Sequence, residues 1–460
     1  MKYYARPNLG QYSNPATKTL VAGALSLLLS VFSTIIAIAL ANTAPNLGFA
    51  RELAGMMYHI TMFSLVLGIL AALAALWISV RQSEADKIRL MIRKRLFSPE
   101  YGNPLHLKEG ERLPKIKCWE IEQGIFEITI TTTCCTANEI REISSSVSAA
   151  LNGKYAQYAV TETYVETAFN SVGFRIEDVK ADKSITVHSV NELKPKEHSK
   201  LIVQKDTVID LTTSGSMIFA GKTRSGKTTG VISILMQALT AGRDNYGSQI
   251  VIIDPKQAEL SRLPHTVTLD EDGEARGILE ALKQFADTIK ERQRVLNDLS
   301  EEKGDAVHWW EANFHVSFLF IDEYVALRSI FPKRAVKEDG GYNLAEFDAL
   351  IKRIVTMGAS AGCYAIISIA EASVEEGGLP AMLRSACTTK ILFKPTPNEG
   401  RLLWDSEKLR DLPQRVYNAG DAWFSSTDGI HDNVSCVHFP RMDFPVYREL
   451  GRLLEDYYKG

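Results

Sequence analysis

Eight consecutive residues have the types and spacing of a phosphate-binding loop. Gly221–Thr228 reads Gly-Lys-Thr-Arg-Ser-Gly-Lys-Thr, which fits the pattern G-x-x-x-x-G-K-T. In such a loop backbone N–H groups face a triphosphate, the lysine contacts the β- and γ-phosphate oxygens, and the last hydroxyl ligates Mg²⁺. The sequence therefore predicts a site for ATP and Mg²⁺, with Thr228 on the metal. The expected nucleotide-binding residues are Gly221, Lys222, Thr223, Arg224, Ser225, Gly226, Lys227, Thr228 and Thr229.

A second motif supplies the acids that ATP hydrolysis needs. Phe318–Ile321 is apolar and is followed by Asp322 and Glu323. A continuous apolar run fits a strand buried on both faces of a parallel sheet, whose carboxyl end opens on the ligand. Asp322 is then the second expected Mg²⁺ ligand, and Glu323 is the base expected to deprotonate the attacking water. The alternative for Glu323 is a solvated acid at the end of the strand.

Alternating strand and helix patterns surround both motifs. The phosphate loop lies between two apolar runs, which predict a strand before it and a helix after it. Further patterns predict strands over Gln249–Asp254 and Cys363–Ile369 and helices over Glu274–Leu299 and Leu344–Met357. Such alternation indicates an α/β fold with a doubly wound parallel sheet, here a P-loop, RecA-like motor over residues 201–460.

Composition limits the remaining possibilities. A chain of 460 residues suggests two or three domains. Lys and Arg number 52 against 55 Asp and Glu, so any contact with nucleic acid must come from a local basic patch. The six cysteines include no C-x-x-C pair, which indicates reduced, structural thiols rather than a zinc site or a disulfide framework.

Two apolar stretches near the start, Thr19–Ala41 and Met56–Val80, are long enough to cross a hydrocarbon core of about 30 Å. They predict a membrane anchor over residues 1–97, and a buried helical hairpin in a soluble protein is the alternative. Lysines and arginines precede the first stretch and follow the second, so the positive-inside rule places both termini in the cytoplasm. The basic residues between 81 and 95 suit either anionic lipid head groups or plain solvation.

Residues 98–200 have the pattern of a small α+β adaptor domain. Short β-rich runs, Phe126–Thr133 and Ser184–His188, lie on either side of a helical segment near Ala137–Leu151. The polar stretch Asn191–Lys200 marks the expected boundary with the motor.

Further residues of the motor carry a resemblance to a known family. Ile253-Asp254-Pro255-Lys256, Glu259-Leu260-Ser261, Pro264-His265 and Glu291-Arg292 are similar to motifs of the FtsK/SpoIIIE and HerA-type DNA-pumping ATPases, over roughly Val208–Phe424. Two spans, a small adaptor and one motor resemble the TcpA-type and FtsK-like coupling proteins of Gram-positive conjugative elements. The resemblance implies a membrane-anchored, ATP-driven DNA translocase, homo-hexameric and not specific for DNA sequence, with a relaxase and secretion-channel proteins as partners.

The chain departs from the family pattern at two places. Where the family has a glutamine after its fourth core strand, this chain has Ala370, and a later family arginine falls on Lys390. Lysine lacks the forked geometry of arginine, so Arg384 is a second candidate for a cation acting in a neighbouring subunit. The alternative for Arg384 is an arginine on a helix surface.

DNA contacts are expected in the loop that follows the acidic motif. Its basic residues are Arg328, Lys333, Arg334 and Lys337. A translocating motor grips backbone phosphates rather than reading bases, which suits such a cluster. A solvated loop is the alternative, because two acids follow at once.

Three other functions fit parts of the pattern. A chromosome-segregation or phage-encoded translocase would share the motor, but more spans and a DNA-reading tail would be expected. A membrane scaffold that binds ATP and DNA but hydrolyses slowly would explain the missing glutamine and arginine. An ABC-type transporter ATPase would need an L-S-G-G-Q element, which does not follow the phosphate loop.

Overall fold

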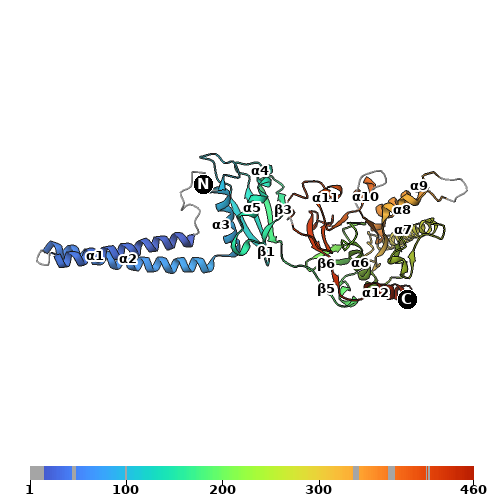
Figure 1. Cartoon of the computed structure of the whole chain (residues 1–460), viewed down its shortest axis with the longest axis horizontal. Helices are drawn as coiled ribbons and strands as arrows, with labels where there is room; N and C mark the ends of the chain where they lie inside the picture. Colours follow the sequence, from blue (N-terminus) through green and yellow to red (C-terminus); the bar gives the residue numbers. More distant parts are fainter. Residues whose placement is uncertain are drawn as a thin grey trace. The chain divides into compact units, whose positions relative to one another are not determined.

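The computed structural model describes residues 15–43, 48–98, 101–334, 341–370, 379–410, 412 and 415–459. Its contacts divide the chain into two units, Met1–Ala181 and Asp182–Gly460 (Figure 1). Residues 182–200, expected in the adaptor, thus lie in the second unit. The reason is their packing, because Val187, Val190 and Leu193 are buried in the core of that unit.

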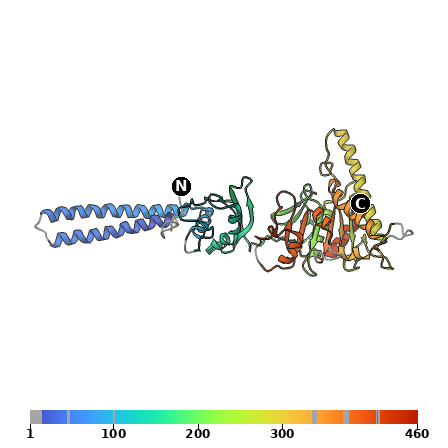
Figure 2. The same cartoon turned by 90° about the horizontal axis from the view of Figure 1, so that it is seen from above.

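The first unit begins with two long helices, α1 (Pro15–Thr43) and α2 (Gly48–Arg81), which run side by side in Figures 1 and 2. Both are long and apolar enough to cross a membrane. Small residues bring them together, since a Cβ on Gly68 would lie 2.7 Å from the Cγ atom of Leu27. Large apolar side chains face outward, and Phe63 is 72% exposed. The expected alternative, a hairpin buried in a soluble protein, does not fit this exposure.

A small α+β domain follows the two helices. Its helices are α3 (Glu84–Phe97), α4 (Ala137–Glu142) and α5 (Ser144–Ala150). Its four strands are β1 (Ile116–Glu122), β2 (Ile125–Thr131), β3 (Tyr158–Val165) and β4 (Ser171–Asp178), paired antiparallel in the order β1-β2-β4-β3. Apolar residues of α3, such as Ile92, pack with Ile128 and Phe174 of the sheet. The expected run Ser184–His188 is no part of this sheet. It contains β5 (Thr186–Val187), which pairs with β16 (Arg441–Met442) in the second unit.

The second unit is built on an eight-stranded sheet in the order β10-β9-β11-β12-β8-β13-β14-β15. The six strands from β10 to β13 are parallel, and β14 pairs antiparallel with both β13 and β15. The bounds of the strands are β8 Met217–Ala220, β9 Ile250–Ile253, β10 Thr266–Val267, β11 Ser317–Ile321, β12 Cys363–Ile369, β13 Thr389–Phe393, β14 Asp421–Ser425 and β15 Ser435–His438. A two-stranded sheet, β6 (Lys200–Gln204) with β7 (Thr207–Asp210), precedes it.

Helices cover both faces of this sheet. One face packs against α6 (Lys227–Ala241) and α12 (Val446–Lys459). The other packs against α7 (Arg276–Lys303), α8 (Tyr324–Ile330), α9 (Leu344–Met357), α10 (Ala381–Ala386) and α11 (Pro397–Leu403). Alternate residues of β8 enter the two cores, Phe219 one and Ile218 the other, which is why the strand is apolar throughout. The expected α/β fold with a parallel sheet is confirmed.

Candidate nucleotide-binding site

The phosphate loop joins β8 to α6, as the sequence predicts. Gly221 donates its N–H to the carbonyl of Ile369 at 3.2 Å, which ties the loop to the neighbouring strand β12. Gly226 has a φ of +95°, and a Cβ there would lie 2.5 Å from the backbone nitrogen of Gly420. Only glycine combines this left-handed backbone with so close an approach. The loop is therefore held in shape by backbone contacts.

Two polar groups of the loop, the Lys227 ammonium and the Ser225 hydroxyl, are buried with too few polar partners to replace water. The Lys227 side chain is only 8% exposed, and burial lowers the pKa of its ammonium although Glu323 and Asp322 pull the other way. The Ser225 hydroxyl is buried and has no hydrogen-bond partner among the described residues. Buried polar groups normally have partners, and a polyphosphate would supply oxygens for both. These residues fit the nucleotide that the motif implies.

The two acids of the second motif lie at the carboxyl end of β11, between β9 and β12. Asp322 accepts a hydrogen bond from the Ser368 hydroxyl at 2.8 Å, and burial raises the pKa of its carboxyl group. Glu323 has a φ of +48°, a strained conformation for a residue with a side chain. Such strain clusters at functional sites, because the surrounding structure must maintain it.

Two lysines contact the carboxylate of Glu323. Its Oε1 atom lies 3.0 Å from the Lys256 ammonium and 3.5 Å from that of Lys227. The Glu323 side chain is only 15% exposed, so both contacts are partly shielded from water. The acid expected to act as base thus lies beside the lysine expected to bind phosphate.

Mg²⁺ has two expected protein ligands, Thr228 and Asp322. The described residues contain no group of three or more His, Cys, Asp or Glu side chains suited to a metal. Two oxygen ligands, completed by substrate phosphates and water, suit Mg²⁺, which rarely sits in an all-protein cage. The donor set fits the ion, and the assignment of these two ligands stays a prediction.

The other predicted loop residues differ in exposure. Thr223, Arg224 and Thr229 are exposed. Lys222 is also exposed and makes an ion pair of 3.3 Å with Glu399 on α11. The contact links the loop to the helix after β13.

The two candidate cations near β13 have partners within their own chain. Lys390 donates to the carbonyl of Leu403 at 3.1 Å, and Arg384 donates to that of Leu402 at 3.1 Å. Both carbonyls belong to the last turn of α11, where basic side chains commonly satisfy unpaired oxygens. Burial lowers the pKa of Lys390. In this chain both residues stabilise a helix end.

The four residues expected to contact DNA have different surroundings. Arg328 makes a bidentate pair with Asp348 on α9, at 2.9 and 2.8 Å. Lys333 and Arg334 are exposed, and Lys337 lies outside the described residues. Arg328 therefore has a structural partner, and the two exposed cations are the better candidates.

Two site residues were not assigned a role from the sequence. Lys256 follows β9, and Ser368 lies near the end of β12, so both neighbour the acids at the end of β11. The carboxyl ends of adjacent parallel strands meet at one edge of the sheet, and this rule could have found them.

The chain matches the model of the FtsK/SpoIIIE family over residues 197–312. It is 26% identical over 151 residues to the FtsK domain-containing protein YdcQ of Bacillus subtilis, which covers 33% of this chain and 28% of that protein. It is 25% identical over 239 residues to the DNA translocase FtsK of Helicobacter pylori, which covers 50% of this chain and 26% of that protein. The chain thus spans little more than a quarter of the length of these relatives.

Solved structures give weaker similarity. The monomer form of the pCW3 conjugation coupling protein TcpA with ATPγS has a TM-score of 0.49 at 15% identity, covering 80% of this chain and 99% of that one. EssC (ATPases 2 and 3) from Geobacillus thermodenitrificans has a TM-score of 0.43 at 17% identity, covering 61% and 52%. These values are too low to support a functional conclusion.

The matched segment contains the phosphate loop, Lys256 and Arg292, and the acids of β11 lie a short distance beyond it. The motifs agree with this match, and residues 197–312 are similar to the FtsK/SpoIIIE family.

Proposed function

We propose that this chain is a membrane-anchored ATPase that moves DNA, and specifically a coupling protein that delivers DNA to a secretion channel during conjugation. The observation that carries the ATPase is the meeting of Lys227, Asp322 and Glu323 at one edge of the sheet. DNA is suggested by the family of the domain and by the name of the Helicobacter pylori relative. The conjugative role rests on the resemblance in domain order.

In this proposal, each residue of the site has a distinct part in hydrolysis. Backbone N–H groups of the loop and Lys227 bind the triphosphate, while Thr228 and Asp322 hold Mg²⁺, which supplies charge neutralisation on phosphate oxygens. Glu323 takes a proton from water as the water oxygen bonds to the γ-phosphorus and the bond to the β-phosphate breaks. A phosphate bound to Lys227 would replace its contact with Glu323, while Lys256 would keep the carboxylate in position to orient that water.

Other parts of the proposal concern assembly and location. The chain forms homo-hexamers around DNA, and exposed cations such as Lys333 and Arg334 contact the backbone without reading its sequence. The helices α1 and α2 cross the cell membrane, with both termini in the cytoplasm. A relaxase and the proteins of the secretion channel are its partners.

Steady-state ATP hydrolysis tests this function. Full-length protein in lipid nanodiscs would be assayed with no DNA, single-stranded DNA and double-stranded DNA, beside Glu323→Gln. We expect DNA to stimulate turnover and the variant to reduce kcat by on the order of 10²-fold or more, since it loses the base. The preferred form of DNA would identify the cargo. Turnover that is equal in Glu323→Gln would contradict the role of this acid.

A second function has one observation in its favour. Lys390 and Arg384 each donate a hydrogen bond to the end of α11, a contact that would have to break before either could complete a neighbouring site. A scaffold that binds ATP and DNA but hydrolyses slowly is consistent with that. ATP binding with turnover near the Glu323→Gln level under every DNA condition would favour the scaffold over the motor.

A further inference from the structure

The segment that follows β9 lies directly beside the two acids at the end of β11. The Asp322 N–H donates to the carbonyl of Ile253 at 2.9 Å, so the backbone joins the ends of these two strands. The next residues, Pro255 and Lys256, leave the sheet in a turn. This turn brings the Lys256 side chain within reach of Glu323.

One buried carboxylate sets the shape of the turn. Asp254 is 0% exposed. Its Oδ1 atom accepts the N–H of Lys256 at 3.1 Å, and its Oδ2 atom accepts those of Ala258 and Ser261 at 2.9 and 3.0 Å. A buried carboxylate is costly unless donors of this kind satisfy it. Asp254 therefore fixes three backbone positions of the turn, and the first of them is that of Lys256.

The far end of the turn is anchored in the core. Leu260 is 2% exposed and packs among the core residues of the second unit. The Ser261 hydroxyl donates to the carbonyl of Ala258 at 2.6 Å. Because the segment is fixed at Asp254 and again at Leu260, the exposed residues between them, Lys256 included, have a defined place.

The contact between Lys256 and Glu323 is suited to orientation rather than to folding stability. The two side chains are 51% and 15% exposed, and the Lys256 ammonium lies 3.0 Å from the Oε1 atom of Glu323. An ion pair with a half-exposed lysine adds little to stability, because water and salt screen it. Glu323 has the strained φ of +48°, and neighbouring contacts must hold its carboxylate in one direction.

Of the two lysines beside Glu323, Lys256 is the one that nucleotide binding leaves in place. Lys227 makes the longer contact, at 3.5 Å, and it is the lysine of the phosphate loop. Lys256 belongs to a different segment, whose position is set by Asp254. A carboxylate that loses Lys227 to phosphate thus still has a cation beside it.

We propose that Lys256 is a positioning residue for Glu323, and that Asp254 in turn positions Lys256. This inference rests on the proposed function, in which Glu323 takes the proton of the attacking water. Lys256 acts through the carboxylate and not on the phosphate itself. The segment Ile253–Lys256, part of the resemblance to DNA-pumping ATPases, then has a physical task, because its aspartate holds the turn and its lysine holds the base.

Steady-state ATP hydrolysis by the full-length protein in lipid nanodiscs tests the role of Lys256. We expect Lys256→Gln to lower kcat by about tenfold or more, since a misdirected base loses much of its effect. The KM for ATP should stay within about twofold of the parent value, because the lost interaction serves the chemical step. Lys256→Arg keeps a cation at this position and should retain more activity than Lys256→Gln. The matched control is Lys290→Gln, a change of an exposed lysine on α7, which should behave as the parent does.

A double variant shows whether Lys256 acts through Glu323. Two residues that serve one step give losses that do not multiply. In single-turnover hydrolysis of radiolabelled ATP, Lys256→Gln should therefore slow the parent protein but change Glu323→Gln little. Losses that multiply in the double variant would mean that Lys256 works independently of the base, and would overturn the proposal.

Asp254→Asn tests the step before Lys256. An amide accepts hydrogen bonds through only one of its two polar atoms, so at least one of the three N–H contacts is lost. The variant should lower kcat less than Lys256→Gln does, and it should add little to the loss in that variant. Its melting temperature is measured alongside, and if the buried change unfolds the protein, the exposed Lys256 variants still decide the question.

Two further results would contradict the proposal. Equal kcat in Lys256→Gln and Lys290→Gln would show that Glu323 needs no second cation. A KM for ATP raised in Lys256→Gln, with and without Glu323→Gln, would show that Lys256 binds phosphate directly. Failure of the proposed function has a different signature, because turnover would then be unchanged in Glu323→Gln itself. Low turnover in Glu323→Gln with parent-like turnover in Lys256→Gln would leave that function standing and remove only the positioning role.

Discussion

Glu323 is the residue on which the chemistry of the site converges. Its carboxylate contacts both Lys256 and Lys227, so the expected base lies between two cations. In the proposed mechanism, phosphate bound to Lys227 would replace the longer of these two contacts and leave the contact with Lys256, at 3.0 Å, in place.

We expect the burial of Lys227 to make ATP affinity depend on pH. Burial lowers the pKa of its ammonium, so the folded, free protein loses this proton at a lower pH than the unfolded chain does. Folding stability consequently rises with pH through that interval, since the unfolded state holds more protons there. ATP needs the charged form, and its affinity should fall as pH rises through the lowered pKa, by up to about tenfold per pH unit.

Titration with a fluorescent ATP analogue between about pH 8 and about pH 10 would measure this fall. Lys227→Arg is the matched control, because a guanidinium stays charged throughout and its affinity should vary less. Parallel pH profiles for the two proteins would show that another group controls the affinity.

Whether a site residue could be predicted from the sequence depends on whether a local motif or the packing of distant elements sets its position. Lys227 and Asp322 follow from local motifs, because a loop or a strand end positions them whatever the rest of the chain does. Lys256 required the order of β9 and β11 in the sheet. Lys390 could not be placed, since its bond to the carbonyl of Leu403 depends on how α11 packs against β13.

At the scale of elements, helix α7 is fixed by one buried arginine. Arg292 is 1% exposed and donates to the carbonyls of Ala361 and His315, each at 2.7 Å, and to the Asp244 carboxylate at 3.0 Å. Burial alone would raise the pKa of Asp244, but Arg292 and backbone N–H groups lower it overall. The arginine of the family's E-R element thus joins α7 to the loops before β9, β11 and β12.

We expect Arg292→Met to destabilise the protein by about 3–5 kcal/mol, because it leaves the Asp244 charge buried without its partner. The melting temperature should fall by roughly 10 °C. Arg294→Met, an exposed change two positions further on, should stay within about 0.5 kcal/mol of the parent. Thermal unfolding followed by fluorescence compares the two. Equal melting of both variants would mean that the arginine network adds no net stability.

Comparing predicted with observed element boundaries shows which sequence patterns were sufficient to locate a helix or strand. Helix α9 and strand β12 have the bounds predicted from their apolar patterns, because each buries a regular face in the core. The run Ser184–His188 was assigned to the adaptor, yet its two paired residues join a strand about 250 residues later, beginning at Arg441. No local pattern encodes a pairing of that separation.

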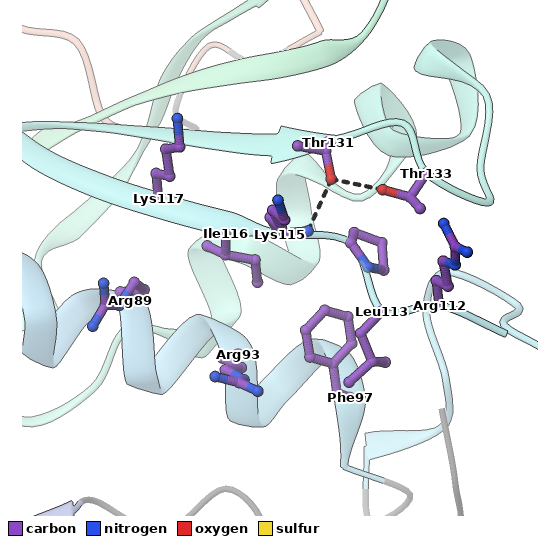
Figure 3. Close-up of a pocket in the computed structure, with 11 residues that line it drawn as sticks. Arg89, Arg93, Phe97, Arg112, Leu113, Lys115, Ile116, Lys117, Thr131 and Thr133 are labelled. Carbon is purple, nitrogen blue, oxygen red and sulfur yellow. Dashed lines mark hydrogen bonds between the residues drawn. The ribbon is translucent and has the colours of Figure 1, made fainter. Parts of the chain in front are cut away.

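At the scale of the whole molecule, the net charge of −3 does not show that basic side chains have different surroundings in the two units. The first unit has a pocket whose lining residues include five with cationic side chains (Figure 3), whereas the second unit keeps its site lysines in contact with Glu323. A motor joined to two apolar helices works on DNA only from the side of the membrane where DNA lies. The proposed function therefore requires one orientation of α1 and α2.

That orientation can be tested by cysteine labelling in intact bacterial cells. Because basic residues flank the two spans but are sparse between them, Gly48→Cys should face the outside and Lys108→Cys the cytoplasm. A membrane-impermeant maleimide should then label Gly48→Cys in intact cells and Lys108→Cys only after permeabilisation. The parent chain, with its six native cysteines, gives the background in each condition. The reverse pattern would place the ATP site outside the cell, where neither ATP nor donor DNA is available, and would contradict the proposed function as a whole.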